Sequence, residues 1–367
     1  MQRSGTTIIF SLTIRLALIS FLLNLAVNTS GVFLPLYARS IGSSYFEIGL
    51  IASVSGIAFL LASLLFGRLS DIYGRLVFIR ASLGLSAIAY LSQGFAHTTT
   101  TLLIARGTIG FFLGVTSVVV IAYTYENQKQ IGNFISYGSL GLVFGTAVAA
   151  IIRDYYPLFL ASAISSFVAF LLAFTLKDRP VSQTRVSIFP LQVLKANRKV
   201  YLAFFLRHLG ANAIWAIFPL YLTDIGATKL WIAIMDIVNN GGQFIVMRII
   251  ERFNPIKMFR MGLLISAVVF VIYGLANNYL QVVPAQVLLA ISWSGMYMGA
   301  LGYLFRNNSE HGTVSGLLYS TIYLSASIGP FLGGSISHLW GFVPVMGFGS
   351  GLTFLGFLHS GGLKNRK

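Results

Sequence analysis

The chain has 367 residues, of which 56% are hydrophobic and only 9% are charged. Because soluble proteins carry about 25% charged residues, this inventory excludes a water-soluble surface over most of the chain. The sequence contains no cysteine, which excludes disulfides, thiolate metal sites and a cysteine nucleophile. The formal net charge of +16 would suit nucleic acid only if the basic residues shared a soluble surface, and their positions argue against this.

Apolar runs follow one another along the whole chain and predict about twelve membrane-spanning helices. A helix needs roughly 20 apolar residues to cross the hydrocarbon core of a bilayer. The predicted fold class is therefore an all-α integral membrane protein. The expected spans lie near residues 12–37, 45–66, 76–95, 99–123, 132–152, 157–176, 200–222, 229–249, 259–276, 279–304, 312–336 and 341–362.

Lysines and arginines outside the spans are distributed unequally between the two sides. Only Arg39, Arg153 and Lys229 fall on the side opposite to the basic connections. Basic connections mark the cytoplasmic side of membrane proteins. We therefore expect a multi-pass protein of the cell membrane with both termini in the cytoplasm. The basic excess would face anionic lipid headgroups, and nucleic acid is not an expected partner.

The sequence also repeats itself at half its length. The segment F-L-P-L-Y at residues 33–37 returns as I-F-P-L-Y at residues 217–221, an offset of 184 residues. The first predicted span thus corresponds to the seventh. We predict two pseudo-symmetric six-helix halves, 1–176 and 200–367, joined by a basic cytoplasmic linker at 177–199.

Residues 67–76, G-R-L-S-D-I-Y-G-R-L, connect the second and third predicted spans. Glycine permits a tight turn between helices, and a carboxylate near hydrocarbon needs a cation or a helix N-terminus. The stretch fits every fixed position of the pattern G-x-L-x-D-x-x-G-R. It resembles the loop between helices 2 and 3 of the major facilitator superfamily.

This resemblance implies a twelve-helix secondary transporter whose halves rock around a site near the midplane. It also implies a cytoplasmic gate that contains Gly67, Asp71, Gly74 and Arg75. In that gate Asp71 would face the N-terminal end of the eleventh span, and Arg75 or Arg68 would pair with an acid at the end of the fourth, where Glu126 stands. The alternative is that these charges only mark a helix boundary.

Three other stretches are similar to the same superfamily. Residues 106–114 carry R-x-x-x-G, whose arginine the resemblance links to proton coupling, and residues 138–145 resemble a glycine-rich motif of exporters. Residues 329–334 supply a Gly-Pro pair that the fifth span lacks. The second-half loop at 251–257 has lost the glycine and aspartate pattern, so we expect an asymmetric gate.

Polar residues inside the spans predict the substrate path, because hydrocarbon tolerates them poorly. Asn24 and Asn28 lie one turn apart in the first span, and His208 and Asn212 occupy the positions 184 residues later. Trp215 lies on the same helix face. We expect these residues to line a shared cavity, with His208 also able to carry protons. The alternative is hydrogen bonding between helices.

The eighth span carries an acid, Asp236, about seven residues from its start. Asn240 and Gln243 extend this polar stripe, and Asn239 lies beside it. A carboxylate in hydrocarbon is costly and can take up and release protons. We expect Asp236 either to couple transport to protons or to balance a cationic substrate.

Two arginines within the spans receive different interpretations. Arg106 is expected to act in proton coupling, on the strength of its motif and its depth. Arg207 is expected to face another side of its helix and to anchor toward the cytoplasm. The alternative role for Asp236 is a structural ion pair with Arg106 or Arg207.

Aromatic residues in the tenth and eleventh spans can complete a pocket. Trp293 and Tyr297 are four residues apart, as are Tyr319 and Tyr323. Such rings stack on apolar groups and sugars or contact a cation, although each also serves as ordinary packing. We include them among the expected substrate-binding residues.

The predicted function is secondary active transport of a small molecule by alternating access, with proton-linked export of an amphiphilic or lipophilic compound preferred. The alternative is an uptake carrier for a sugar or organic metabolite, and a distant one is a non-transporting membrane scaffold. The sequence lacks a phosphate-binding G-x-x-x-x-G-K-[ST] loop and an H-E-x-x-H pair, so we expect neither an enzyme nor a cofactor or metal. The expected partners are a small-molecule substrate, protons and membrane lipids, with the chain acting as a monomer.

Overall fold

The computed structural model describes most of the chain, and the described part contains helices and no strand. The chain divides into two compact units. Unit 1 comprises residues 1–42 and 54–184, and unit 2 comprises residues 43–53 and 185–367. The described ranges are 3–128, 132–177, 191–250, 253–308 and 311–363.

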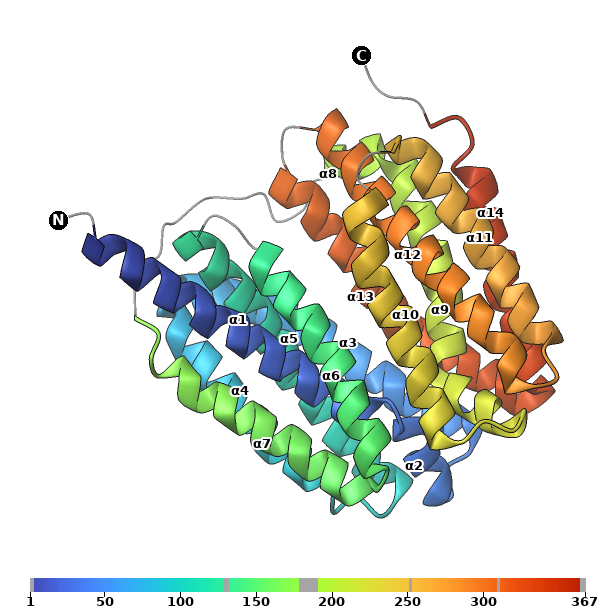
Figure 1. The fold of residues 1–367 in the computed structure, drawn as a ribbon, viewed down its shortest axis with the longest axis horizontal. Coiled ribbons are helices and arrows are strands. Elements are labelled where there is room, and N and C mark those ends of the chain that lie inside the picture. Colours follow the sequence, from blue (N-terminus) through green and yellow to red (C-terminus); the bar gives the residue numbers. More distant parts are fainter. Residues whose placement is uncertain (1–2, 129–131, 178–190, 251–252, 309–310, 364–367) are drawn as a thin grey trace. The chain divides into compact units, whose positions relative to one another are not determined.

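Unit 1 is a bundle in which the first helix packs along the fifth and sixth predicted spans. Helix α1 lies against α6 and α7, and α4 lies against α5 and α7 (Figure 1). Buried aliphatic side chains, among them Ile19, Leu83 and Val119, form its core. The helices are α1 (Arg3–Gly31), α2 (Leu34–Ser40), α3 (Tyr45–Tyr73, whose first residues belong to unit 2), α4 (Arg75–Gln93), α5 (Thr99–Gln128), α6 (Gly132–Ile152) and α7 (Tyr155–Ala173).

Unit 2 repeats this kind of packing. Helix α9 lies against α13 and α14, and α11 lies against α12 and α14, while α10 packs on α12. Its core includes Phe204, Phe259, Leu263 and Met296. The helices are α8 (Leu191–Ala196), α9 (Arg198–Asp224), α10 (Lys229–Ile250), α11 (Pro255–Leu275), α12 (Tyr279–Asn307), α13 (His311–Trp340) and α14 (Phe342–His359).

The first predicted span is interrupted in the structure. Helix α1 ends at Gly31 and α2 begins at Leu34, where the sequence predicted an uninterrupted span at 12–37. Pro35 lies in the first turn of α2. Proline lacks a backbone N–H, and its ring clashes with the carbonyl four residues earlier, here that of Gly31, so Pro35 disfavours a continuous helix through residues 31–35.

The two copies of the repeated segment perform the same structural task. The hydroxyl of Tyr37 donates to the carbonyl of Ala96 at 2.7 Å, beyond the end of α4. The hydroxyl of Tyr221 donates to the carbonyls of Tyr273 and Ala276, at the end of α11. Each tyrosine thus ties its own helix to the end of the equivalent helix in its unit, which is α4 for Tyr37 and α11 for Tyr221. The glycines that follow, Gly42 and Gly226, both have φ of +91°, a conformation that other residues rarely adopt.

Length and composition make many of these helices able to cross a bilayer. Within the described ranges, ten helical segments are long and apolar enough, and Tyr137–Ile152 is a shorter apolar helix. The predicted linker at 177–199 contains the short helix α8 among its described residues.

Candidate functional site

A cluster of aromatic rings in unit 2 brings together residues from α9, α12 and α13. The imidazole of His208 stacks on Phe204 with ring centroids 4.5 Å apart and meets the edge of Trp293 at 4.8 Å. Trp293 stacks on Tyr297 at 5.3 Å. The Tyr297 hydroxyl lies 3.0 Å from that of Tyr319 on α13. We call these five residues, Phe204, His208, Trp293, Tyr297 and Tyr319, the aromatic cluster.

The aromatic cluster also contains polar groups, namely the His208 imidazole and the hydroxyls of Tyr297 and Tyr319. His208 is buried, and its Nδ1 lies 3.3 Å from the carbonyl oxygen of Phe204. A carbonyl can only accept, so Nδ1 carries the proton in this bond and Nε2 has the acceptor lone pair. Trp215 extends the ring contacts from His208, at a centroid distance of 6.5 Å. Tyr323 interacts electrostatically with Tyr297 from the next turn of α13.

Arg207 lies directly beside this cluster and is fully buried, with 0% of its surface exposed. The sequence-based expectation that it anchors toward the cytoplasm is therefore wrong. Its Nε donates to Ser266 Oγ at 3.1 Å, and its guanidinium carbon lies 5.3 to 5.6 Å from the ring centroids of Trp293, Trp215 and Phe270. Among the described residues its two terminal nitrogens have no hydrogen-bond partner. A cation enclosed by rings gains cation–π attraction, which lowers the cost of burying it.

Asn212 links α9 to α13 next to the cluster. Its side-chain nitrogen donates to the His208 carbonyl at 2.9 Å and to Ser325 Oγ at 3.3 Å. Close approach of the helices makes this possible, since a Cβ at Gly329 would lie only 2.7 Å from that of Asn212. Gly329, the glycine of the Gly-Pro pair noted in the sequence, thus packs directly against Asn212, a predicted site residue.

A chain of amides holds α10 against α12. Gln243 donates to the side-chain oxygen of Asn239, and Asn239 donates to Gln286 Oε1 at 3.0 Å. Asn239, which the sequence placed beside the polar stripe, thus links Gln243 of the stripe to α12, while Asn240 makes no hydrogen bond within the described part. Asp236 lies half-buried on the same helix, one turn before this network, and has an interaction within the chain.

The predicted polar residues of the first span lie in unit 1 and face α6. Asn28 donates to the Leu142 carbonyl at 2.9 Å and to Thr146 Oγ1 at 2.5 Å. Asn24 donates to the Ser20 carbonyl one turn earlier in its own helix, at 2.9 Å. Asn28 thus makes the hydrogen bonds between helices that were the alternative to cavity lining.

The glycine-rich stretch at 138–145 explains how α6 approaches α1 so closely. A Cβ at Gly141 would lie 3.1 Å from that of Asn24, and one at Gly145 would lie 3.1 Å from that of Asn28. Small residues permit such close helix contacts in membranes. The two glycines therefore fix the two asparagines against a neighbouring backbone.

Arg106 lies on α5, one turn before glycines that pack against α3. Its Nε is buried and has no hydrogen-bond partner among the described residues, although Tyr90 on α4 is close enough to interact electrostatically. A Cβ at Gly114 would lie 2.9 Å from the Cα of Phe59 on α3. The R-x-x-x-G motif thus combines a buried cation with a tight contact between helices.

The 67–76 stretch forms a helix–turn–helix connection. Helix α3 ends at Tyr73, Gly74 has φ of +91°, and α4 begins at Arg75. The Arg75 side chain is buried and donates to Ser70 Oγ at 3.0 Å, and Ser70 Oγ donates to the Gly67 carbonyl at 2.8 Å. Arg75 thus links the start of α4 to the end of α3 through Ser70.

The two acidic side chains of the predicted gate are not covered by the structure. The side chains of Asp71 and Glu126 lie outside the described residues. The expected pairing of Arg75 with Glu126 therefore stays a prediction.

In the part of the chain that the structure describes, no group of three His, Cys, Asp or Glu residues could hold a metal ion.

Two polar residues that sequence reasoning did not assign to the site belong to these networks. Arg207 had a signal, because it lies nine residues inside a span that begins at Arg198. Gln286 had a weaker one, a single amide within an apolar run. Polar groups at such depth are costly unless they contact one another. Depth within the span would have identified both as candidates.

Comparisons with known proteins agree with this architecture. A family model described as Major Facilitator Superfamily matches residues 16–235 and 200–363. The chain is 24% identical to the multidrug resistance protein MdtG of Salmonella arizonae, over 93% of this chain and 92% of that protein. It is 22% identical to the quinolone resistance protein NorA of Staphylococcus aureus, over 86% and 87%.

Solved structures of low sequence identity share the fold. The nucleoside transporter NupG superposes with a TM-score of 0.79 at 13% identity, covering 96% of this chain and all of that one. The human organic anion transporter MFSD10 gives 0.71 at 18% identity, covering 95% and 98%. These matches confirm the predicted all-α, twelve-helix membrane fold. The chain is a multi-pass membrane transporter, not an enzyme, and belongs to the Major Facilitator Superfamily.

Proposed function

We propose that this transporter exports a small amphiphilic or lipophilic compound across the cell membrane and couples the export to protons. The observation that carries the proposal is the aromatic cluster of unit 2. Stacked rings offer an apolar surface, and His208, Asn212 and the Tyr297–Tyr319 hydroxyl pair place polar groups beside it. Binding sites for small molecules combine these two elements.

The relatives support export as the direction. MdtG and NorA are both named for drug resistance. Their identity to this chain is low, so their substrates are not transferred to it. An amphiphilic substrate fits the cluster because rings accept apolar groups of varied shape and demand few fixed hydrogen bonds.

Asp236 is the proposed proton carrier, together with Arg106 and His208. The amide chain Gln243–Asn239–Gln286 holds α10, the helix that carries Asp236, against α12. A carboxylate within a membrane span is a functional candidate in its own right, because its charge is costly there. Protonation would remove that charge during one part of the transport cycle.

The proposed gate is the 67–76 connection, closed by Arg75 and completed by Asp71 and Glu126. The proposed orientation follows the positive-inside pattern, with this connection and both termini in the cytoplasm. The proposed halves are residues 1–176 and 200–367, joined by the linker at 177–199, and the chain would work as a monomer. Asn24, Asn28 and Asn240 remain proposed contributors to that site.

A thermal-unfolding screen of the detergent-purified protein tests the substrate class. A ligand that binds only the folded state at 100 times its Kd stabilises it by about 2.7 kcal/mol. Amphiphilic drugs, sugars, nucleosides and organic acids form the panel. We expect stabilisation by amphiphiles, loss of it in Trp293→Ala, and retention in Trp340→Ala, whose side chain is exposed and outside the cluster.

The screen also distinguishes the alternatives. Stabilisation by a sugar or nucleoside alone would favour the uptake carrier, with the asparagines and tyrosines as hydroxyl partners. A response to no class of compound would favour the non-transporting scaffold. A Trp340→Ala variant that loses the response as fully as Trp293→Ala would show that the cluster is not the site.

A further inference from the structure

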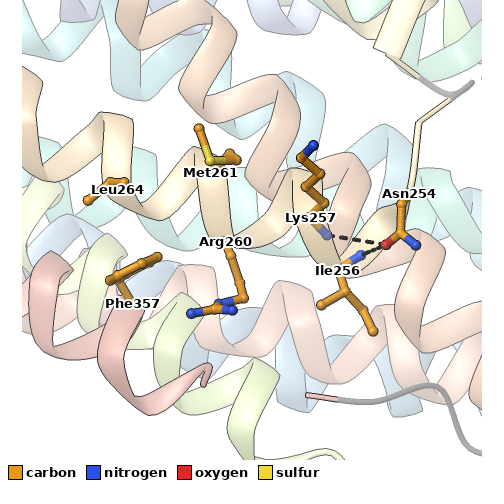
Figure 2. Close-up of a pocket in the computed structure, with 7 residues that line it drawn as sticks. All are labelled: Asn254, Ile256, Lys257, Arg260, Met261, Leu264 and Phe357. Carbon is orange, nitrogen blue, oxygen red and sulfur yellow. Dashed lines mark hydrogen bonds between the residues drawn. The ribbon is translucent and has the colours of Figure 1, made fainter. Parts of the chain in front are cut away.

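A groove of about 460 Å³ lies at the N-terminal end of α11, where this helix packs beside α14. Figure 2 shows Arg260 pointing toward the ring of Phe357 on α14, with Lys257 one turn nearer the start of α11. Asn254 caps the helix by accepting from the backbone nitrogens of Ile256 and Lys257. Backbone N–H groups at the start of α11 therefore already have a hydrogen-bond partner. The charged groups of the groove are the side chains of Lys257 and Arg260.

Arg260 has donors to spare. Its guanidinium carbon lies 5.1 Å from the Phe357 ring centroid, and its Nε is buried with no hydrogen-bond partner among the described residues. None of the described residues that line the groove is acidic. A guanidinium has five N–H donors in a fork that matches phosphate oxygens. The groove thus presents at its polar end a guanidinium whose chemistry suits an anion.

The other end of the groove is apolar and continues into the surface of the bundle. Met261 and Leu264 follow Lys257 at the spacing of one helix face, and Met261 is 46% exposed. Val268 and Val271 extend the exposed apolar stripe along α11. A cation pair followed by a hydrocarbon-facing stripe matches a molecule with an anionic head and a long acyl chain.

We propose that this groove binds an anionic phospholipid. The phosphate group contacts Arg260 and Lys257, and an acyl chain lies along Met261, Leu264 and the Phe357 ring. Lys257 is exposed and reaches the headgroup from the rim, while the half-buried Arg260 reaches it from inside the groove. Basic side chains near a membrane surface favour anionic lipids in this way.

A comparable groove in unit 1 provides a contrast within the same chain. It occupies about 520 Å³ beside α4 and α7, and Arg80 lies over Phe174 at 5.0 Å, much as Arg260 lies over Phe357. Arg80, however, donates to the carbonyls of Ala173 and Leu176 at 3.3 Å each. Its guanidinium is already engaged by the end of α7. The unit 1 groove therefore lacks the unengaged guanidinium that distinguishes the groove at α11.

Native mass spectrometry of the full-length, delipidated protein in detergent tests the proposal. The probes are phosphatidylglycerol and phosphatidylcholine with identical acyl chains, and inorganic phosphate in a separate arm. We expect phosphatidylglycerol to be retained more tightly than phosphatidylcholine. Arg260→Gln should weaken its binding about fivefold, since one basic residue near the surface contributes about that factor.

Arg306→Gln is the matched control, because Arg306 is an exposed cation in the last turn of α12 and does not line the groove. This variant should retain the selectivity, as should the charge-conserving Arg260→Lys, which also guards against misfolding of Arg260→Gln. Equal retention of the two lipids would overturn the proposal. So would equal losses in Arg260→Gln and Arg306→Gln, or full competition by inorganic phosphate.

Discussion

Gly329→Ala tests how closely α9 and α13 must pack to form the site. The added methyl carbon would lie 2.7 Å from Asn212 Cβ, 2.7 Å from the Leu209 carbonyl oxygen and 3.1 Å from the Ala213 nitrogen. Ordinary contacts begin at 3.4 Å, so the two helices must separate locally by about 0.7 Å. The bond from Asn212 to Ser325, now 3.3 Å, would lengthen to about 4 Å and be lost.

The free-energy terms for this variant have opposite signs. Overpacking costs about 1–3 kcal/mol and the lost hydrogen bond about 0.6 kcal/mol, while alanine gains about 1 kcal/mol in helix propensity. We expect a net loss of stability on the order of 1–2 kcal/mol and weaker binding of the substrate. The assay is thermal unfolding of purified protein with and without ligand.

Gly316→Ala is the control in the same helix. No described atom lies within 4 Å of the position that its Cβ would occupy. Only the propensity gain applies, so this variant should be as stable as the parent or up to about 1 kcal/mol more stable. The reasoning is refuted if Gly329→Ala is as stable as Gly316→Ala, because the short contacts would then be relieved without moving Asn212.

Two further substitutions address the gate and the buried cation. Gly74→Ala places a side chain at φ of +91°, which should cost about 1–2 kcal/mol, and a midpoint unchanged in thermal unfolding would show that the turn adapts. Arg207→Met removes a buried charge without breaking an ion pair among the described residues, so folding should survive. Ligand affinity should nevertheless fall about tenfold, because Trp215 and Trp293 lose a shared cation–π partner. Isothermal titration measures this change, and wild-type affinity would exclude Arg207 from the site.

The fold was predictable because its main determinants are local. Apolar length sets the spans, and the repeat at 33–37 and 217–221 is matched in the structure by equivalent bonds of Tyr37 and Tyr221. The break at residues 32–33 lies inside the predicted span, because the apolar run continues through it as the single segment Leu12–Ser40. Its signal was the proline itself, which hydrophobicity alone does not weigh.

The site was less predictable because helix spacing identifies a face but not the neighbour that covers it. Asn28 and Asn212 occupy equivalent positions in the repeat, and each is bonded to the equivalent neighbouring helix of its own unit, α6 for Asn28 and α13 for Asn212, but neither neighbour could be named from helix spacing alone. Asn239, rather than Asn240, reaches across to Gln286. The burial of Arg207 depends on Trp215 of its own helix together with Phe270 of α11 and Trp293 of α12, which are distant in sequence. Tertiary packing decides each of these outcomes.

Substrate accumulation in proteoliposomes under an imposed pH gradient tests the central claim most directly. The substrate is the compound that gives the largest thermal stabilisation, and a protonophore provides the baseline. We predict that the wild-type protein accumulates it against its gradient and that Asp236→Asn only equilibrates it. Accumulation by Asp236→Asn at the wild-type level would remove Asp236 from the mechanism. Equilibration alone by the wild-type protein would contradict proton-linked export.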